Sequence, residues 1–143
     1  MPAFRFYQPI EVRYGDLDPQ GHVNNARYLT YCEHARISYV RHLGLWQEGA
    51  SWLDFGFILA EVRLTFQKPV RFGQPLRLGV RTTHLGSKSL AMEYRLEDVH
   101  SGEAHCTGSS VMVAYDYQHN QSVPIPQNWR DVILEYEDLE ENG

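Results

Sequence analysis

Apolar and polar residues alternate along most of the chain, and a period of two is typical of β-strands that bury one face. Pro9 interrupts the first such run, and turn pairs such as Gly86-Ser87 and Ser101-Gly102 separate later ones. The alternation predicts strands over residues 4–14, 58–66, 76–81, 90–97 and 104–115. We expect the last four of these to form a meander of long antiparallel strands.

A different spacing marks the residues between the first two strands. Apolar residues recur there at steps of three and four, which is the period of a one-sided helix. They are Tyr28, Leu29, Cys32, Ala35, Tyr39, Val40 and Leu43. Asn24 or Asn25 is the expected N-cap, and Gly44 is expected to end the helix in a left-handed conformation. A second, short helix is predicted from Trp129 to about Glu137.

One early helix followed by antiparallel strands predicts an α+β fold, in which the helix fills the concave side of a curved sheet. A chain of 143 residues suffices for one core, so we expect residues 1–143 to form a single domain. Beyond residue 117 we expect a loop, the short helix and a mobile acidic tail, EDLEENG. The connection from Trp46 to Gly56 is long and rich in aromatic residues, which suits a loop that lines a pocket.

Composition narrows the functional classes. The formal net charge is −5 and Lys68 and Lys88 are the only lysines, which argues against a general nucleic-acid binder. Cys32 and Cys106 form no disulfide framework or metal-ligand pair, and the seven histidines lack zinc-ligand spacing. No window approaches the ~20 apolar residues that span a bilayer. We therefore expect a cytoplasmic protein with no metal, no other cofactor and no membrane partner, in which Cys32 is a buried core thiol.

The turn before the long helix carries the strongest chemical signal. Asp16 and Asp18 lie where the first strand ends, and Pro19 and Gly21 turn the chain into the helix. Such a turn places a carboxylate near the helix N-terminus, whose free N–H groups stabilise a developing negative oxygen. These groups suit attack on a carbonyl. From the residues alone, Asp18 is either a catalytic carboxylate or a turn cap, and Asp16 is expected to hold the turn through backbone hydrogen bonds.

This turn and helix resemble the hotdog-fold thioesterases of the 4-hydroxybenzoyl-CoA thioesterase family. The matching residues are Asp16-Leu17-Asp18-Pro19-Gln20-Gly21-His22-Val23-Asn24-Asn25, Tyr28, Tyr31, Glu33 and Arg36, and more loosely Phe66-Gln67-Lys68-Pro69-Val70 and Leu85-Gly86-Ser87-Lys88-Ser89-Leu90. The resemblance covers about Glu11 to Tyr115. It implies a hotdog fold, a long central helix wrapped by a curved antiparallel sheet, and acyl-CoA thioesterase activity. The string from His22 to Asn25 is also similar to plant acyl-carrier-protein thioesterases, so the resemblance implies a thioester of coenzyme A or of acyl carrier protein as the substrate.

The resemblance also implies roles for single residues. The family's catalytic aspartate matches Asp18, which would act as nucleophile or general base, and the oxyanion site matches the backbone N–H at or next to Asn25. Family members pair as dimers and often as tetramers, so we expect a homodimer or homotetramer with a site between subunits. Residues expected to come from the neighbouring subunit are Phe57, Leu59 and Lys88. The full set expected to bind substrate is His22, Asn24, Phe57, Leu59, Lys88 and Ser89.

Two other functions are consistent with the same residues. In a hotdog dehydratase or hydratase, His22 and Glu33 would be the acid–base pair, although Glu33 is also expected to pair with Arg36 at three-residue spacing. In the other alternative, the protein binds acyl thioesters without turning them over.

Overall fold

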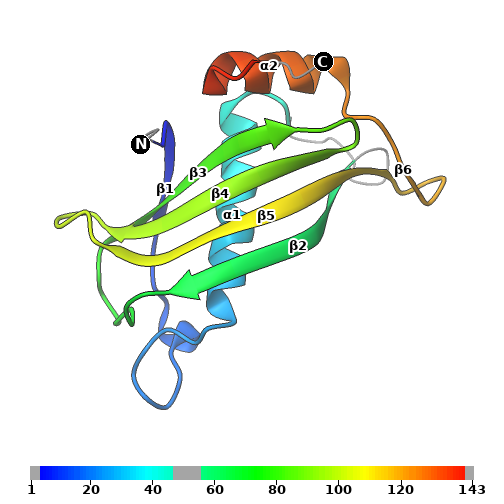
Figure 1. Ribbon diagram of the computed structural model, residues 1–143. Coiled ribbons are helices and arrows are strands. Elements are labelled where there is room, and N and C mark those ends of the chain that lie inside the picture. The colour runs from blue at the N-terminus through cyan, green and yellow to red at the C-terminus, as the bar shows by residue number, and fades with distance from the viewer. Residues whose placement is uncertain (1–3, 47–55, 141–143) are drawn as a thin grey trace.

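The computed structural model describes residues 4–46 and 56–140 of the chain. Figure 1 shows a curved sheet with the long helix α1 along one face and the short helix α2 across one end of it. None of the described helices is long and apolar enough to span a bilayer. The predicted α+β arrangement is confirmed. In chain order the elements are β1 Phe6–Ile10, the 3₁₀ turn η1 Tyr14–Asp16, α1 Arg27–His42, β2 Gly56–Phe66, β3 Leu76–Leu85, β4 Ser89–Asp98, β5 Ala104–Asp116, β6 Gln121–Ser122 and α2 Gln127–Glu137.

The strands pair in the order β1-β3-β4-β5-β2, all antiparallel, and the short β6 extends the sheet beside β5. The meander prediction is right for β3, β4 and β5 and wrong for β2, which pairs with β5 instead of β3. Residues 67–75 cause this difference, because they cross the ends of β5 and β4 before β3 begins. The N–H groups of Gln67 and Lys68 donate to the His105 carbonyl of β5 along this path.

The core lies between α1 and the inner face of the sheet. The apolar residues predicted to face the core from β3 and β4 are buried, and they are Leu76, Leu78, Val80, Leu90, Met92, Tyr94 and Leu96. Gly79, Thr82, Leu85 and Glu97 of the same strands are buried as well. The buried residues of α1 are Tyr28, Tyr31, Cys32, Ala35 and Tyr39. The predicted helix stripe is wrong at one turn, where Leu29 is 41% exposed. Tyr31 is buried instead, because its hydroxyl finds a buried partner in Asp16.

The two ends of α1 differ in how well they were predicted. Gly44 has a φ of 74° and ends the helix in the left-handed conformation, as expected. The helix begins at Arg27, later than predicted, and its N-cap position is Ala26. The Asn24 side chain accepts a hydrogen bond from the Ala26 N–H at 2.9 Å, so it stabilises the turn before the helix instead of capping the helix itself.

The segments near the two chain ends also differ from prediction. β1 ends at Ile10, and Tyr14, predicted in that strand, lies in η1 with 82% of its surface exposed. Glu137, the first residue of the tail predicted to be mobile, is the last residue of α2, and its Oε2 accepts hydrogen bonds from the Tyr39 hydroxyl at 2.6 Å and the Thr82 N–H at 2.7 Å. Most of the predicted pocket loop, residues 47–55, lies outside the described residues.

β2 is an edge strand, although its alternation predicts a half-buried one. Ala60 and Phe66 are exposed, and of the whole strand only Gly56 is buried. A bulge between Leu59 and Glu61 shifts the register against β5 and leaves Ala60 without a partner there. Within residues 4–46 and 56–140, β2 pairs on one side only. An apolar edge strand of this kind can pair with a strand of another chain.

Replacing Val80, which is 0% exposed, by alanine tests the assignment of the core. We expect the free energy of unfolding to fall by about 2 kcal/mol or more, because two buried methyl groups are lost and a cavity remains. Denaturant titration measures the change. Val99→Ala, in the turn after β4 where the side chain is 45% exposed, is the matched control and should stay within ~0.5 kcal/mol of the wild type. Equal losses in the two variants would contradict this core.

Candidate active site

The buried carboxylate of Asp16 organises the loop between β1 and α1. Its Oδ2 accepts hydrogen bonds from the Tyr31 hydroxyl at 2.7 Å and the Arg13 N–H at 3.0 Å, and Arg27 lies 3.8 Å from Oδ1. Burial by itself raises the pKa of Asp16, but the hydrogen bonds from Arg13 and Tyr31 and the charges of Arg13 and Arg27 outweigh it and hold the pKa below its ordinary value. The predicted structural role of Asp16 is confirmed, and Tyr31 is its second partner.

Asp18 lies in the tight turn that follows. Its carbonyl accepts a hydrogen bond from the Gly21 N–H at 2.9 Å, and Gly21 adopts the φ of 81° that this turn requires. Oδ1 of the Asp18 carboxylate accepts hydrogen bonds from the N–H groups of Gln20 at 2.9 Å and His22 at 3.4 Å. Oδ2 accepts none from the part of the chain that the structure describes. The half-buried carboxylate therefore keeps one oxygen available to a reactant.

The backbone N–H of Asn25 is the second group at this turn. Its neighbours are engaged, since the Asn24 N–H donates to the Asp16 carbonyl at 2.8 Å and the Ala26 N–H to the Asn24 side chain at 2.9 Å. Of the described residues 22–28, Asn25 alone has a backbone N–H that donates to no protein acceptor. It lies just before α1, at the positive end of the helix dipole. Such a donor is suited to hold an anionic oxygen.

Asp18 and Asn25 line one pocket of about 350 Å³, which we call the Asp18 pocket. His22 and Asn24, both predicted to bind substrate, line it as well. The fold adds Tyr28 of α1, together with Phe66 at the end of β2 and the residues that follow it, Gln67, Lys68 and Pro69. In the sequence this second segment carried only the looser part of the resemblance. It reaches the pocket because it crosses from β2 towards β3 at the end of the sheet where α1 begins.

Tyr28 forms a wall of the Asp18 pocket. Its ring packs edge-on against Phe66, with ring centroids 4.9 Å apart. Burial, with smaller contributions from Cys106 and Asp18, raises the pKa of Tyr28 to about 12. The hydroxyl is therefore protonated at neutral pH, and Tyr28 is no general base there, in agreement with its predicted packing role.

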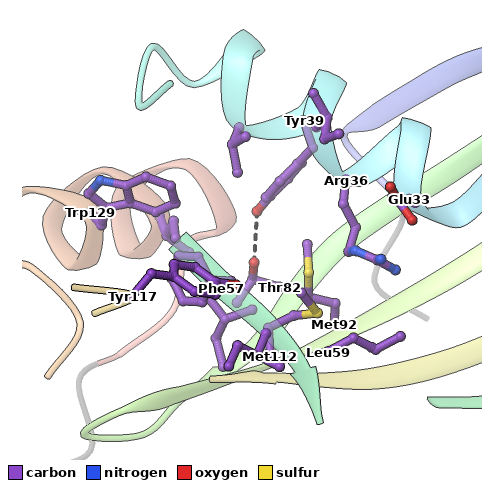
Figure 2. A pocket seen from close by; sticks show the side chains of 15 residues that line it. Glu33, Arg36, Tyr39, Phe57, Leu59, Thr82, Met92, Met112, Tyr117 and Trp129 are labelled. Atoms are coloured by element: carbon purple, nitrogen blue, oxygen red, sulfur yellow. Dashed lines mark hydrogen bonds between the residues drawn. The ribbon is translucent and has the colours of Figure 1, made fainter. Parts of the chain in front are cut away.

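A second, larger pocket of about 430 Å³ lies between α1, β2 and α2, and we call it the apolar pocket. Figure 2 shows its lining, which includes Met92 and Met112 of the sheet and Trp129 of α2. Phe57 and Leu59, predicted to bind substrate, line this pocket and not the Asp18 pocket. Within one chain, the fold does not bring them to Asp18.

Glu33 and Arg36 line the apolar pocket, but the ion pair predicted between them is not formed in the described structure. The Arg36 guanidinium lies 5.9 Å from the centre of the Tyr94 ring and donates a hydrogen bond to the Tyr94 hydroxyl at 3.3 Å. The acid–base pair of the dehydratase alternative is also separated, because His22 lines the Asp18 pocket and Glu33 the apolar one.

Lys88 and Ser89 lie where β3 turns into β4, and they line neither of the two pockets. Ser89 is opposite Val113 of β5, and Ile58 of β2 is opposite the same residue. The turn is therefore at the end of the sheet that carries the apolar pocket, away from Asp18 of its own chain.

The cysteines and histidines show no second reactive centre in the described residues, where no cluster of His, Cys, Asp and Glu is arranged to hold a metal ion. Cys32 is 2% exposed, and burial raises its pKa to about 12, so it is the buried core thiol that was predicted. Burial likewise raises the pKa of Cys106 to about 11. Both thiols are protonated at neutral pH and are poor nucleophiles.

Comparisons with known proteins give one consistent family. The family described as "Thioesterase-like superfamily" matches residues 12–135. The protein YsmA of Bacillus subtilis (strain 168), described as uncharacterized, is 30% identical over 132 residues, which cover 92% of this chain and 87% of YsmA. Acyl-CoA thioester hydrolase YbgC of Escherichia coli O6:H1 is 26% identical over 91 residues, 64% of this chain and 68% of YbgC. A thioesterase of Thermus thermophilus, crystallised with coenzyme A and Zn, has a TM-score of 0.81 and 34% identity, and the match covers 98% of this chain and 100% of that one.

Replacing Asp16 by asparagine should remove part of the pH dependence of stability. The pKa of Asp16 is lower in the folded protein than in the unfolded chain, where it is about 4, so the ionised group stabilises the fold above about pH 4. This contribution is lost as the pH falls through the lower, folded-state pKa. Urea denaturation in acid should therefore show a steeper loss in the wild type than in Asp16→Asn. Asp131→Asn, at an exposed position of α2, should keep the wild-type slope, and parallel profiles for all three proteins would contradict the role of Asp16.

Proposed function

The chain belongs to the thioesterase-like superfamily and has its hotdog fold, and from this premise we propose that it hydrolyses an acyl-CoA thioester to a free acid and a thiol. The observation that carries the proposal is the Asp18 pocket, which joins a half-buried carboxylate to a backbone N–H that donates to no acceptor among the described residues. The names of YbgC and of the Thermus protein support the reaction type, and the coenzyme A crystallised with the latter supports the leaving group. Membership of the 4-hydroxybenzoyl-CoA thioesterase family in particular stays a prediction.

A thioester needs little more than these two groups, because sulfur donates weakly into the carbonyl and a thiolate leaves readily. In one route, Asp18 takes a proton from a water molecule whose oxygen attacks the acyl carbon. In the other, Oδ2 of Asp18 attacks that carbon directly, and water then hydrolyses the mixed anhydride. In both routes the carbonyl oxygen becomes negative and accepts a hydrogen bond from the Asn25 N–H. Collapse of this oxyanion breaks the C–S bond, which gives the free acid in the first route and the mixed anhydride in the second. The thiolate takes a proton from solvent, and in the first route Asp18 returns to solvent the proton that it took from water.

A second copy of the chain completes this site in our proposal. Phe57 and Phe66 are at opposite ends of β2, roughly 30 Å apart at 3.3 Å per residue, and Phe66 lines the Asp18 pocket. When two open β2 edges pair antiparallel, the start of one strand lies beside the end of the other. Phe57 and Leu59 of the partner subunit then lie near Asp18, and the partner's apolar pocket takes the acyl group. This pairing would form the predicted homodimer, and two such dimers would form the predicted homotetramer.

The same pairing suggests how coenzyme A is bound. Lys88 and Ser89 are at the end of the sheet that carries Phe57, so Lys88 of the partner subunit approaches the Asp18 pocket with it. Its ammonium group would attract the phosphates of coenzyme A, in a contact that weakens with salt. His22 and Asn24 of the first chain line the pocket where the thioester itself lies. An acyl-carrier-protein substrate would present the same phosphopantetheine arm.

Thiol release from a panel of aliphatic, hydroxylated and aromatic acyl-CoAs tests the proposed reaction. We expect release from at least one class by the wild type and a fall in kcat/KM of about 10²- to 10⁴-fold in Asp18→Asn, since this variant loses the base or nucleophile. Asp131→Asn is the matched control and should retain full activity. Asn25→Ala should lose less than ~10-fold, because the donor is its backbone N–H and not its side chain.

The same panel decides between the proposal and its alternatives. Hydration of an enoyl thioester with the thioester bond intact would replace the proposal by the hydratase. Thermal stabilisation by acyl-CoA or acyl carrier protein without any turnover would replace it by the binding protein.

Ala60→Pro separates assembly from folding. Ala60 lies in the bulge, opposite no residue of β5, and bulges of edge strands tolerate proline, so we expect the fold to survive while proline obstructs pairing with a second β2. Light scattering on eluted protein should give a dimer or larger species for the wild type and for Ala60→Val, and a smaller species with reduced thiol release for Ala60→Pro. A monomeric wild type of full activity would contradict the shared site.

A further inference from the structure

Helix α2 forms one wall of the apolar pocket. Trp129 and Ile133 contribute side chains to its lining, and the Trp129 ring packs on Phe57 with ring centroids 5.1 Å apart. Figure 2 shows Trp129 at one side of the pocket and Leu59 and Arg36 at the opposite side. Figure 1 shows α2 across the end of the molecule where α1 terminates. α2 therefore limits the pocket at the C-terminal end of α1.

Hydrogen bonds from both ends of α2 hold this wall in place. Near its end, Glu137 Oε2 accepts from the Tyr39 hydroxyl at 2.6 Å and the Thr82 N–H at 2.7 Å. Near its start, Arg130 Nη1 donates to the Gly86 carbonyl at 2.6 Å. Burial, together with the nearby Glu137, raises the pKa of Tyr39, so its hydroxyl stays protonated and keeps donating. The position of Trp129 is thus set by contacts to α1, to β3 and to the turn after β3.

The wall near α2 suits an apolar acyl group. Tyr39 and Thr82 line the pocket, but they hydrogen-bond each other at 2.9 Å, as the dashed line in Figure 2 shows, and both also bond Glu137. These polar groups are therefore already satisfied and gain nothing from a polar substrate group. Apart from Glu33, Arg36 and Tyr117, the rest of the lining is apolar and includes Ile37, Val40, Leu90, Met92 and Met112. Contact with such a surface favours hydrocarbon by about 25 cal/mol per Å² removed from water.

We propose that Trp129 determines the largest apolar acyl group that the protein accepts. The inference rests on the proposed function, because it takes the apolar pocket as the acyl site. Trp129 does not touch the reacting atoms in this scheme. It acts as a specificity residue, since a longer acyl chain would have to displace an indole that is packed on β2 and carried by an anchored helix.

Trp129→Ala tests this role by enlarging the pocket. We expect kcat/KM for saturated acyl-CoAs longer than the wild-type optimum to rise about 10-fold or more relative to that optimum, because each methylene accommodated in an apolar pocket is worth at least that factor. Leu134→Ala is the matched control. It truncates a partly buried side chain of the same helix that lines a different cavity, and it should keep the wild-type length preference. Trp129→Leu is the second variant, in case the alanine variant does not fold.

Binding measured without turnover separates this inference from the proposed reaction. S-alkyl-CoA thioethers of increasing length resist hydrolysis, and each should raise Tm as far as it is bound. The Trp129 variants should be stabilised by thioethers longer than the longest one that stabilises the wild type. This outcome does not depend on whether any of the proteins hydrolyses thioesters. A shifted limit without hydrolysis would overturn the proposed reaction and leave the inference standing. Three results would overturn the inference. The length limit for stabilising thioethers could be unchanged in the folded Trp129 variants, it could shift equally in Leu134→Ala, or no thioether could stabilise the wild type.

Discussion

The hydrogen bond between the carboxylate of Asp16 and the hydroxyl of Tyr31 is the contact on which the site geometry depends. A buried carboxylate is costly unless it is paired, and here its partners come from the loop and from α1. The carbonyl of the same residue accepts the Asn24 N–H, so the loop is attached to the turn on both sides of Asp18. The two proposed reacting groups are the carboxylate of Asp18 and the backbone N–H of Asn25. The Asp16 contacts therefore fix their relative position, although neither group contacts the core itself.

The open edge of β2 is the second constraint. The strand is apolar, carries a bulge and is paired on one side only in the described residues, which is an arrangement that folded proteins usually cover. The Asp18 pocket lies at one end of β2 and the apolar pocket at the other. A two-fold pairing of this edge would join the chemical half of the site in one subunit to the acyl half in the next, so assembly and activity would depend on the same strand.

The two pockets differ in what they leave unsatisfied. In the Asp18 pocket an oxygen of Asp18 and the N–H of Asn25 have no partner among the described residues, which suits a reaction centre. In the apolar pocket Tyr39, Thr82 and Glu137 satisfy one another, which leaves a surface that favours hydrocarbon. The residue that ties the last helix to the core thus also makes the end of the apolar pocket unattractive to polar groups.

Periodicity and turn residues are local properties, and they were enough to predict the α+β class, the buried faces of β3 and β4, the end of α1 at Gly44 and the turn that carries Asp16 and Asp18. The remaining features depend on contacts between residues that are distant in the sequence. Tyr31 is buried in place of Leu29 because a distant carboxylate offers it a partner, and β2 is an edge because residues 67–75 carry the next strand past it. Phe57 and Leu59 lie apart from Asp18, and Glu137 is anchored, because strand order and helix packing join residues that no local pattern relates.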